Sequence, residues 1–193
     1  VYDPICHWVW GGGWMSWHVD FAGGSVVHIS SGTSAFVCSW FLGRRHGVNR
    51  SEEAEAHNVP LVVLGASMLW FGWSGFNGGS ALAGDAGDNA LSGLAALAIA
   101  TTSLSAASGM VSWNCCEALT GERPSTIGSA CGAVVGLVAI TPGAGFVPPL
   151  AALPIGVLGA AVCFAATDAL RRVEDADDSL DVFACHGVGG IVG

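Results

Sequence analysis

Four long stretches without a charged residue constrain this chain more than any other feature. They contain no Asp, Glu, Lys or Arg, and they cover residues 21–43, 59–84, 89–116 and 124–167. About 20 helical residues cross the roughly 30 Å hydrocarbon layer of a membrane, so each of the first three stretches predicts one transmembrane helix. The fourth predicts two, because residues 141–149 contain three prolines and two glycines, which break a helix.

A sixth apolar segment begins near Asp181 and runs to Gly193. The chain therefore predicts an all-α, polytopic membrane protein with about five complete transmembrane helices and the start of a sixth, in one transmembrane domain over residues 1–193. Composition agrees, since 52% hydrophobic residues, 11% charged residues and a mean hydropathy of +0.58 are unusual for a soluble domain. The 29 glycines fit the same class, because small residues let membrane helices approach closely.

The cations predict the orientation of the helices. All six are arginines, and five crossings place all of them on one face: Arg44, Arg45, Arg50, Arg123, Arg171 and Arg172. By the positive-inside rule this face is cytoplasmic, in a multi-pass protein that we expect in the plasma membrane. The opposite face carries Asp3, Asp85 and Asp88 and no cation. The net charge of −9 gives no support to a nucleic-acid partner.

Metal and enzyme motifs are weak in this sequence. The seven cysteines show no CxxC spacing, which favours packing residues over metal ligands or disulfides. The histidines show no HxxxH or HExxH spacing, and GWSG at residues 72–75 lacks the last glycine of a nucleophile elbow. We therefore expect no enzyme, no metal and no cofactor. A metal-dependent hydrolase inside the membrane is the weakest hypothesis, and it would use His7, His18, Asp20 and Asp168.

Two histidines, His28 and His186, differ from the others in lying at membrane depth. Ionisable groups inside a membrane mark functional sites by default, although each ring could also pack between helices on a neighbouring carbonyl. Helix lengths alone do not pair them. His28 lies roughly 24 Å of helix before Arg44, whereas His186 lies roughly 8 Å after Asp181. The depths agree only if the last helix starts earlier or Asp181 is recessed.

Five motifs in order carry a resemblance to a known family: VWGGG, DFAGGSVVHI, GWSGFNGGSA, ITPGAGFV and DVFACHGVGGIVG. Together they resemble the ammonium transporter and Rhesus glycoprotein family, and its ammonium transporter branch most closely. The resemblance implies an eleven-helix inverted-repeat fold. This chain would supply the fifth to ninth helices and the start of the tenth, without helices one to four, the eleventh and the cytoplasmic tail. It also implies a homotrimer, with a cytoplasmic regulatory protein as a possible partner.

The resemblance implies six site residues. Three look like an outer site that holds an ammonium ion on aromatic faces and a hydroxyl: Trp10, Phe76 and Ser80. Phe76 also resembles one of two stacked phenylalanines that close an outer gate. Asp20 resembles an aspartate near that site, expected to accept backbone N–H groups and to attract cations through its field. His28 and His186 look like the twin histidines that line the pore.

The implied function is transport of ammonium or ammonia across the lipid bilayer. A cation that enters a dry pore loses hydration, and burial disfavours the charged form of an amine, so ammonium sheds its proton. Potassium has no proton to shed. Each neutral imidazole then offers one donor and one acceptor to the ammonia. Proton return through the histidines and return along separate water both stay open. The alternative is an ammonium sensor that keeps the fold but conducts little.

Overall fold

The structure is a computed structural model that describes residues 1–45, 56–83, 88–172 and 177–193, without the side chains of residues 82–92. These residues form helices joined by turns and loops, and no strand occurs among them. The elements are α1 (Tyr2–Trp10), η1 (Gly24–Ile29), α2 (Ser30–Leu42), α3 (Val59–Gly79), η2 (Ser80–Ala83), α4 (Asp88–Leu119), α5 (Thr126–Ile140), α6 (Pro149–Leu170), η3 (Phe183–Val188) and α7 (Gly189–Val192). The all-α prediction is confirmed.

Four described helices are long and apolar enough to cross a membrane: Gly24–Leu42, Val59–Gly79, Gly93–Leu119 and Pro149–Leu170. The predicted break is also present, because α5 ends at Ile140 and α6 begins at Pro149. Proline suits the first turn of a helix, where its missing N–H is not needed. α5 itself has 15 residues and spans only about 22 Å, which is shorter than the expected crossing.

The short helix α1 was not predicted from the sequence. Its nine residues are too few for the length criterion that identified the other helices. The helix ends at Gly11, whose N–H donates to the carbonyl of His7, and its buried residue Val9 lies on the side that packs near η1. α1 therefore leads the chain into the loop before η1, the segment that carries His28.

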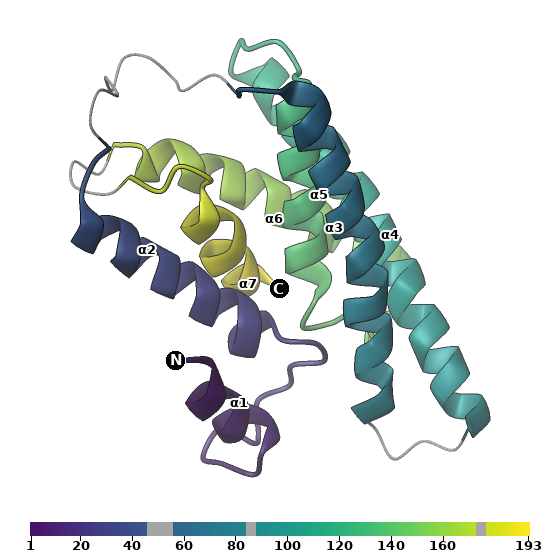
Figure 1. Ribbon diagram of the computed structural model, residues 1–193. Helices are drawn as coiled ribbons and strands as arrows, with labels where there is room; N and C mark the ends of the chain where they lie inside the picture. Colours follow the sequence, from purple (N-terminus) through teal and green to yellow (C-terminus); the bar gives the residue numbers. More distant parts are fainter. Residues whose placement is uncertain (46–55, 84–87, 173–176) are drawn as a thin grey trace.

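The helices α4, α5 and α6 pack together on one side, with α3 against α4 and α5 (Figure 1). Three α4 serines donate across this bundle: Ser105 Oγ to the Gly136 carbonyl at 2.7 Å, Ser108 Oγ to Leu153 at 2.9 Å, and Ser112 Oγ to Val157 at 2.9 Å. Such bonds hold helices where the hydrophobic effect does not drive them together. The segment η3–α7 lies between α2 and α6, and so completes the packing (Figure 1).

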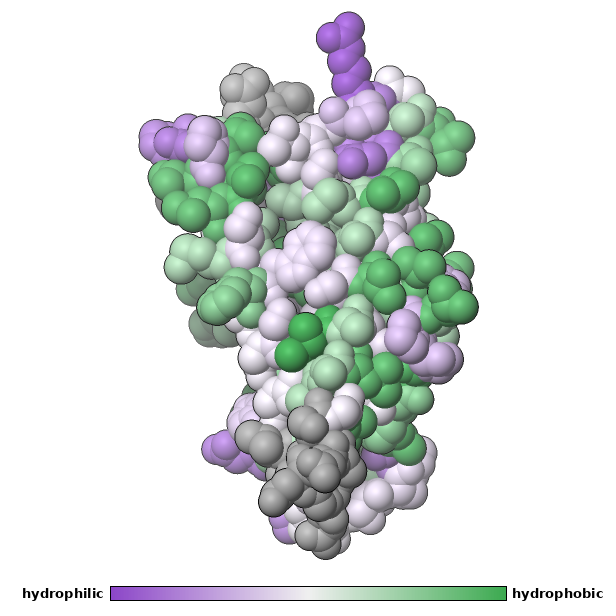
Figure 2. Space-filling model, turned by 90° about the vertical axis from the view of Figure 1, so that its right-hand side faces the viewer, coloured by the Kyte–Doolittle hydropathy of each residue, from purple (hydrophilic) through white to green (hydrophobic). Residues whose placement is uncertain are grey.

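Apolar and hydrophilic side chains occupy different parts of the molecular surface. Figure 2 shows mostly hydrophobic or neutral side chains over the middle of one face and hydrophilic ones near its ends. Large exposed apolar side chains on α3 include Leu61, Leu64, Met68 and Phe71. The ends of α2, α4 and α6 lie toward the same side of the bundle in Figure 1, and the described arginines follow them: Arg44, Arg45, Arg123, Arg171 and Arg172. Arg50 lies outside the described residues.

Candidate functional site

His28 and His186 both lie in short π-helical segments near the beginning of a helix. The segment η1 carries His28 and continues into α2, and η3 carries His186 and continues into α7. The two Nδ1 atoms lie 3.3 Å apart, and the ring centroids lie 5.3 Å apart. The structure thus brings together rings that are 158 residues apart in the sequence. Neither ring bonds to a backbone carbonyl among the described contacts, so the simple packing alternative does not describe them.

A non-helical run precedes the segment that carries His186. The last helix begins at Phe183, and the described residues before it, 177–182, are almost entirely turn and coil. The run is a turn, because the Asp181 N–H donates to the Asp178 carbonyl at 3.1 Å. At its first described residue, Asp177 Oδ2 accepts from Arg45 Nε at 2.7 Å, and that guanidinium holds the pKa of Asp177 below its usual value. The run ends where Asp178 Oδ2 accepts from the Phe183 N–H at 2.7 Å.

Glycines let the two histidine-bearing segments approach closely. A Cβ atom added at Gly32 on α2 would collide with the backbone of Gly187 on η3. A Cβ at Gly190 would meet the Gly24 carbonyl at 2.7 Å and the His28 Cβ at 3.1 Å. Only residues without a side chain fit these positions. The contact between the two imidazoles therefore depends on backbone packing as well as on the rings.

Asp20 anchors the first of these segments. Its buried carboxylate accepts four backbone N–H groups, from Gly23 at 2.8 Å, Gly24 at 2.7 Å, Ser25 at 2.9 Å and Val26 at 3.2 Å. These are the N–H groups that a helix leaves unpaired at its N-terminus, where negative charge is also favoured. The sequence-based expectation that this aspartate accepts backbone donors agrees with these contacts.

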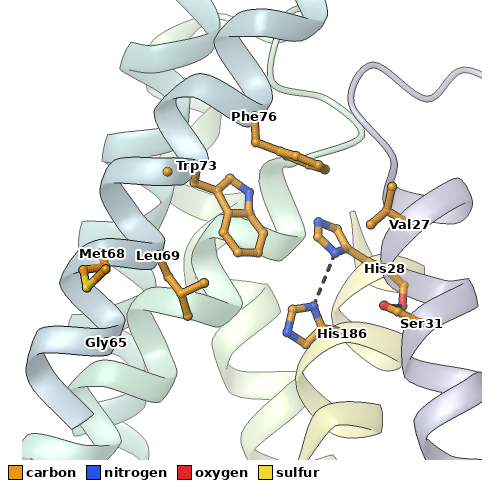
Figure 3. Close-up of a pocket in the computed structure, with 10 residues that line it drawn as sticks. Val27, His28, Ser31, Gly65, Met68, Leu69, Trp73, Phe76 and His186 are labelled. Atoms are coloured by element: carbon orange, nitrogen blue, oxygen red, sulfur yellow. Dashed lines mark hydrogen bonds between the residues drawn. The ribbon is translucent and has the colours of Figure 1, made fainter. Parts of the chain in front are cut away.

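The histidine pair lines a cavity of about 600 Å³ (Figure 3). Its other lining residues are mostly apolar: Val27, Ser31, Gly65, Met68, Leu69, Gly72, Trp73 and Phe76. The Trp73 ring stacks on His28 with a centroid distance of 5.2 Å, and Phe76 lies 5.9 Å from the same ring. An apolar cavity with two imidazoles suits a small neutral molecule that can form hydrogen bonds, because few groups in it could replace the hydration of an ion.

Two residues of this site were missed by sequence reasoning. Trp73 lies in GWSGFNGGSA and Thr141 lies in ITPGAGFV, two motifs that carried the resemblance, but neither residue was given a role of its own. Both join the pair through hydrogen bonds, since Trp73 Nε1 and His28 Nε2 lie 3.0 Å and 3.1 Å from Thr141 Oγ1. Helix periodicity could have found Trp73, because it lies three residues before Phe76 and so shares its face.

The four outer-site candidates form two separate groups. Trp10 Nε1 donates to the Asp20 carbonyl at 2.8 Å, and Ser80 Oγ donates to the Phe76 carbonyl at 2.9 Å. The side chains of Trp10 and Phe76 are 43% and 39% exposed. Within the described part of the chain, no hydrogen bond or ring contact joins Trp10 to Phe76 or Ser80.

The four residues of the metal-dependent hydrolase hypothesis do not form a metal-binding group within the described part of the chain. The described residues contain no group of three or more His, Cys, Asp or Glu side chains placed to hold a metal ion. Asp20 is occupied by its four N–H groups, and Asp168 pairs with Arg172 at 2.7 Å. The four residues proposed for that site therefore serve other contacts or stand apart.

Known proteins are similar to this chain in both sequence and structure. The profile of the Ammonium Transporter Family matches residues 1–193. The ammonium transporter of Bacillus subtilis (strain 168) is 45% identical over 195 residues, which cover 100% of this chain and 46% of that protein. The crystal structure of Candida albicans Mep2 matches with a TM-score of 0.85 at 40% identity, covering 100% of this chain and 42% of that one.

A solved structure named Sensor Amt Protein matches with a TM-score of 0.87 at 33% identity, covering 99% of this chain and 49% of that one. The chain thus spans less than half the length of these relatives. The apolar helices and the transporter relatives together indicate a multi-pass membrane protein. This chain belongs to the ammonium transporter family.

Proposed function

We propose that this chain forms part of a pathway for ammonium or ammonia across a membrane, and that His28 and His186 line it. The observation that carries this proposal is the meeting of the two rings, with Nδ1 atoms 3.3 Å apart, in a cavity whose walls are otherwise almost entirely apolar. Burying polar rings among apolar side chains costs free energy unless they are bonded or used. The relatives named as ammonium transporters supply the substrate of the proposal.

The outer end of the pathway would capture the ion. Trp10 and Phe76 keep large parts of their rings exposed, and an aromatic face attracts a cation by about 0.5–2 kcal/mol. The Ser80 hydroxyl offers an acceptor next to Phe76. Asp20 is fully occupied by backbone N–H groups, so its part would be to hold η1 and to attract cations through its field. Phe76 lies between this region and His28, where it could close the entrance.

The inner part of the pathway would carry the neutral molecule. Leaving water raises the free energy of ammonium far more than that of ammonia, so the ion transfers its proton to water at the outer end of the pathway before it reaches the rings. Ammonia then exchanges hydrogen bonds with the imidazoles, which stand in for water. Potassium cannot release a proton and keeps the full cost of desolvation. Selectivity thus follows from acid–base chemistry as well as from size.

We further propose that the arginine-bearing ends of α2, α4 and α6 face the cytoplasm of a plasma-membrane transporter, following the positive-inside rule. The full-length protein would be a homotrimer with the eleven-helix fold of its family, to which this chain contributes a single transmembrane domain. A cytoplasmic regulatory protein could bind the arginine-bearing end.

The test is ammonium uptake by the full-length protein in reconstituted vesicles. We expect His28→Ala to change flux or discrimination against potassium by about tenfold, which corresponds to about 1.4 kcal/mol in a barrier. Trp10→Leu should weaken the apparent affinity for ammonium, because it removes the aromatic face. His57→Ala and Trp40→Leu are matched controls at exposed positions away from the cavity. Unchanged flux and selectivity in both site variants would contradict the proposal.

A second candidate is an ammonium sensor that keeps the same site. The similarity to the protein named Sensor Amt Protein favours it, because the TM-score of 0.87 covers 99% of this chain. A sensor would bind ammonium with the same residues but conduct little. Wild-type flux near that of empty vesicles, together with ammonium binding that Trp10→Leu weakens, would favour the sensor over the transporter.

A further inference from the structure

Thr141 forms an unusual set of hydrogen bonds at the end of α5. Its backbone N–H bonds to the Val138 carbonyl at 3.1 Å, three residues back, instead of continuing the α-helical pattern to Leu137. The side-chain Oγ1 of Thr141 lies 2.8 Å from the Leu137 carbonyl. Two acceptors at this distance would repel, so the hydroxyl must donate its only proton to that carbonyl. Thr141 has no second proton to give.

Two further groups point at the same hydroxyl oxygen. Trp73 Nε1 lies 3.0 Å away and is a donor in every state of the ring. His28 Nε2 lies 3.1 Å away, and it must also donate because the proton of the hydroxyl is already used. The hydroxyl of Thr141 thus gives one hydrogen bond and accepts two, which is its full capacity.

The direction of these hydrogen bonds also determines which ring nitrogens of His28 and His186 carry a proton. A neutral His28 with a proton on Nε2 has a bare Nδ1, which must accept from His186 Nδ1 at 3.3 Å. His186 then carries its proton on Nδ1 and keeps a bare Nε2. No described residue bonds to that nitrogen, and the His186 ring lines the cavity beside Leu69 (Figure 3).

We propose that Thr141 is a positioning residue that fixes the tautomers of both histidines and leaves His186 Nε2 as the acceptor that faces the cavity. The functional part of this inference rests on the proposed transport function. The pair would then offer a hydrogen-bond acceptor to a passing molecule and no donor, so the molecule must present an N–H or O–H donor. Ammonia meets this requirement with three such groups. Thr141 itself would not bind the molecule, since its hydroxyl is saturated.

The tautomers can be measured directly by solid-state ¹⁵N NMR on the full-length protein with ¹⁵N-labelled histidine, because protonated and bare ring nitrogens have well-separated shifts. His28→Ala and His186→Ala samples assign the signals. In the wild type we expect a bare Nδ1 on His28 and a bare Nε2 on His186. One ordinary hydrogen bond biases a tautomer equilibrium by roughly two- to tenfold. Thr141→Val removes the hydroxyl at nearly constant volume, so it should yield a mixture of tautomers on both rings.

Three variants make this test specific. Thr141→Ser keeps the hydroxyl and should restore the wild-type pattern. Trp73→Phe removes the other donor to Thr141 and should leave the tautomers unchanged, because His28 keeps its acceptor. Thr101→Val is the matched control, since Thr101 is buried and donates to the Ala144 carbonyl at 2.7 Å without contacting either histidine. Wild-type signals in Thr141→Val, or opposite tautomers in the wild type, would overturn the proposal.

Flux measurements separate this inference from the proposed function. If the histidines carry transport, Thr141→Val should lower flux several-fold and Thr141→Ser should recover it. If His28→Ala leaves flux unchanged while Thr141→Val still shifts the ¹⁵N signals, the positioning role stands and the transport role of the pair fails. If His28→Ala impairs flux while Thr141→Val changes neither signals nor flux, the pair functions without Thr141 and this inference fails.

Discussion

The two π-helical segments that carry the histidines follow one plan but hold their rings differently. In both, an aspartate just before the segment accepts backbone N–H groups at its start. Asp20 accepts four such groups and is buried, whereas Asp178 accepts one and is half-buried. His28 is only 3% exposed and both of its ring nitrogens are bonded, whereas His186 uses one. The segment η1 therefore holds the His28 ring through both of its nitrogens, whereas η3 leaves one nitrogen of the His186 ring without a described hydrogen bond.

The largest loss of stability should come from Asp20→Ala, because Asp20 is the stronger of the two aspartate anchors. Asp20→Ala removes an acceptor from four N–H groups at a buried helix start, and each bond to a charged group contributes about 1.5–3 kcal/mol. We expect a loss above about 5 kcal/mol, so that the full-length variant yields little monodisperse protein. Size-exclusion chromatography and thermal unfolding in detergent measure this. A midpoint within a few degrees of the wild type would show that the anchor of η1 lies elsewhere.

The next largest effect should come from Gly32→Ala, which pushes α2 and η3 apart instead of removing an anchor from one segment. Gly32→Ala places a methyl group against the backbone of Gly187, and overpacking of this kind costs about 1–3 kcal/mol. We expect a lower unfolding midpoint and a larger loss of ammonium flux, because the imidazoles move apart. Gly93→Ala is the control, since a Cβ there meets no atom within 4 Å. Equal effects of the two substitutions would contradict a role for this close approach.

The sequence predicted the helices better than it predicted these contacts. Charge-free stretches and prolines located the long helices and the break after Ile140, because membrane thickness and proline chemistry act locally. The packing of Gly32 on Gly187 and the contact between the two imidazoles depend on segments far apart in the chain, and no local pattern encodes them. Of the site, the resemblance supplied the two histidines, whereas Thr141 gave no signal beyond a helix break.

A smaller effect should come from the weaker anchor. Asp178→Ala removes the acceptor of a single backbone N–H, that of Phe183, in a half-buried position. The expected loss is about 1–2 kcal/mol, or a few degrees in the unfolding midpoint, with folded protein still obtained. Thermal unfolding beside Asp20→Ala measures the difference between the two anchors. Comparable losses in both variants would show that the number of N–H groups at the carboxylate does not set the strength of the anchor.

The smallest loss of stability should come from breaking the ion pair between Arg45, which follows α2, and Asp177, which precedes η3. Arg45 donates to both carboxylate oxygens of Asp177 at 2.7 Å and 2.9 Å, and this contact lowers the Asp177 pKa from its ordinary 3.8. A carboxyl with a lowered pKa in the folded state stabilises the protein above its unfolded-state pKa, and the contribution disappears as the pH falls through the folded value.

Thermal unfolding of the wild type and of Asp177→Asn should therefore differ slightly at neutral pH and converge below about pH 4. The effect is small because the Arg45 side chain is 49% exposed, so water and salt screen the pair. High salt should reduce the difference at neutral pH in the same way. A difference that stays constant down to pH 3 would mean that Asp177 acts through packing, and that its charge adds nothing to the stability of the protein.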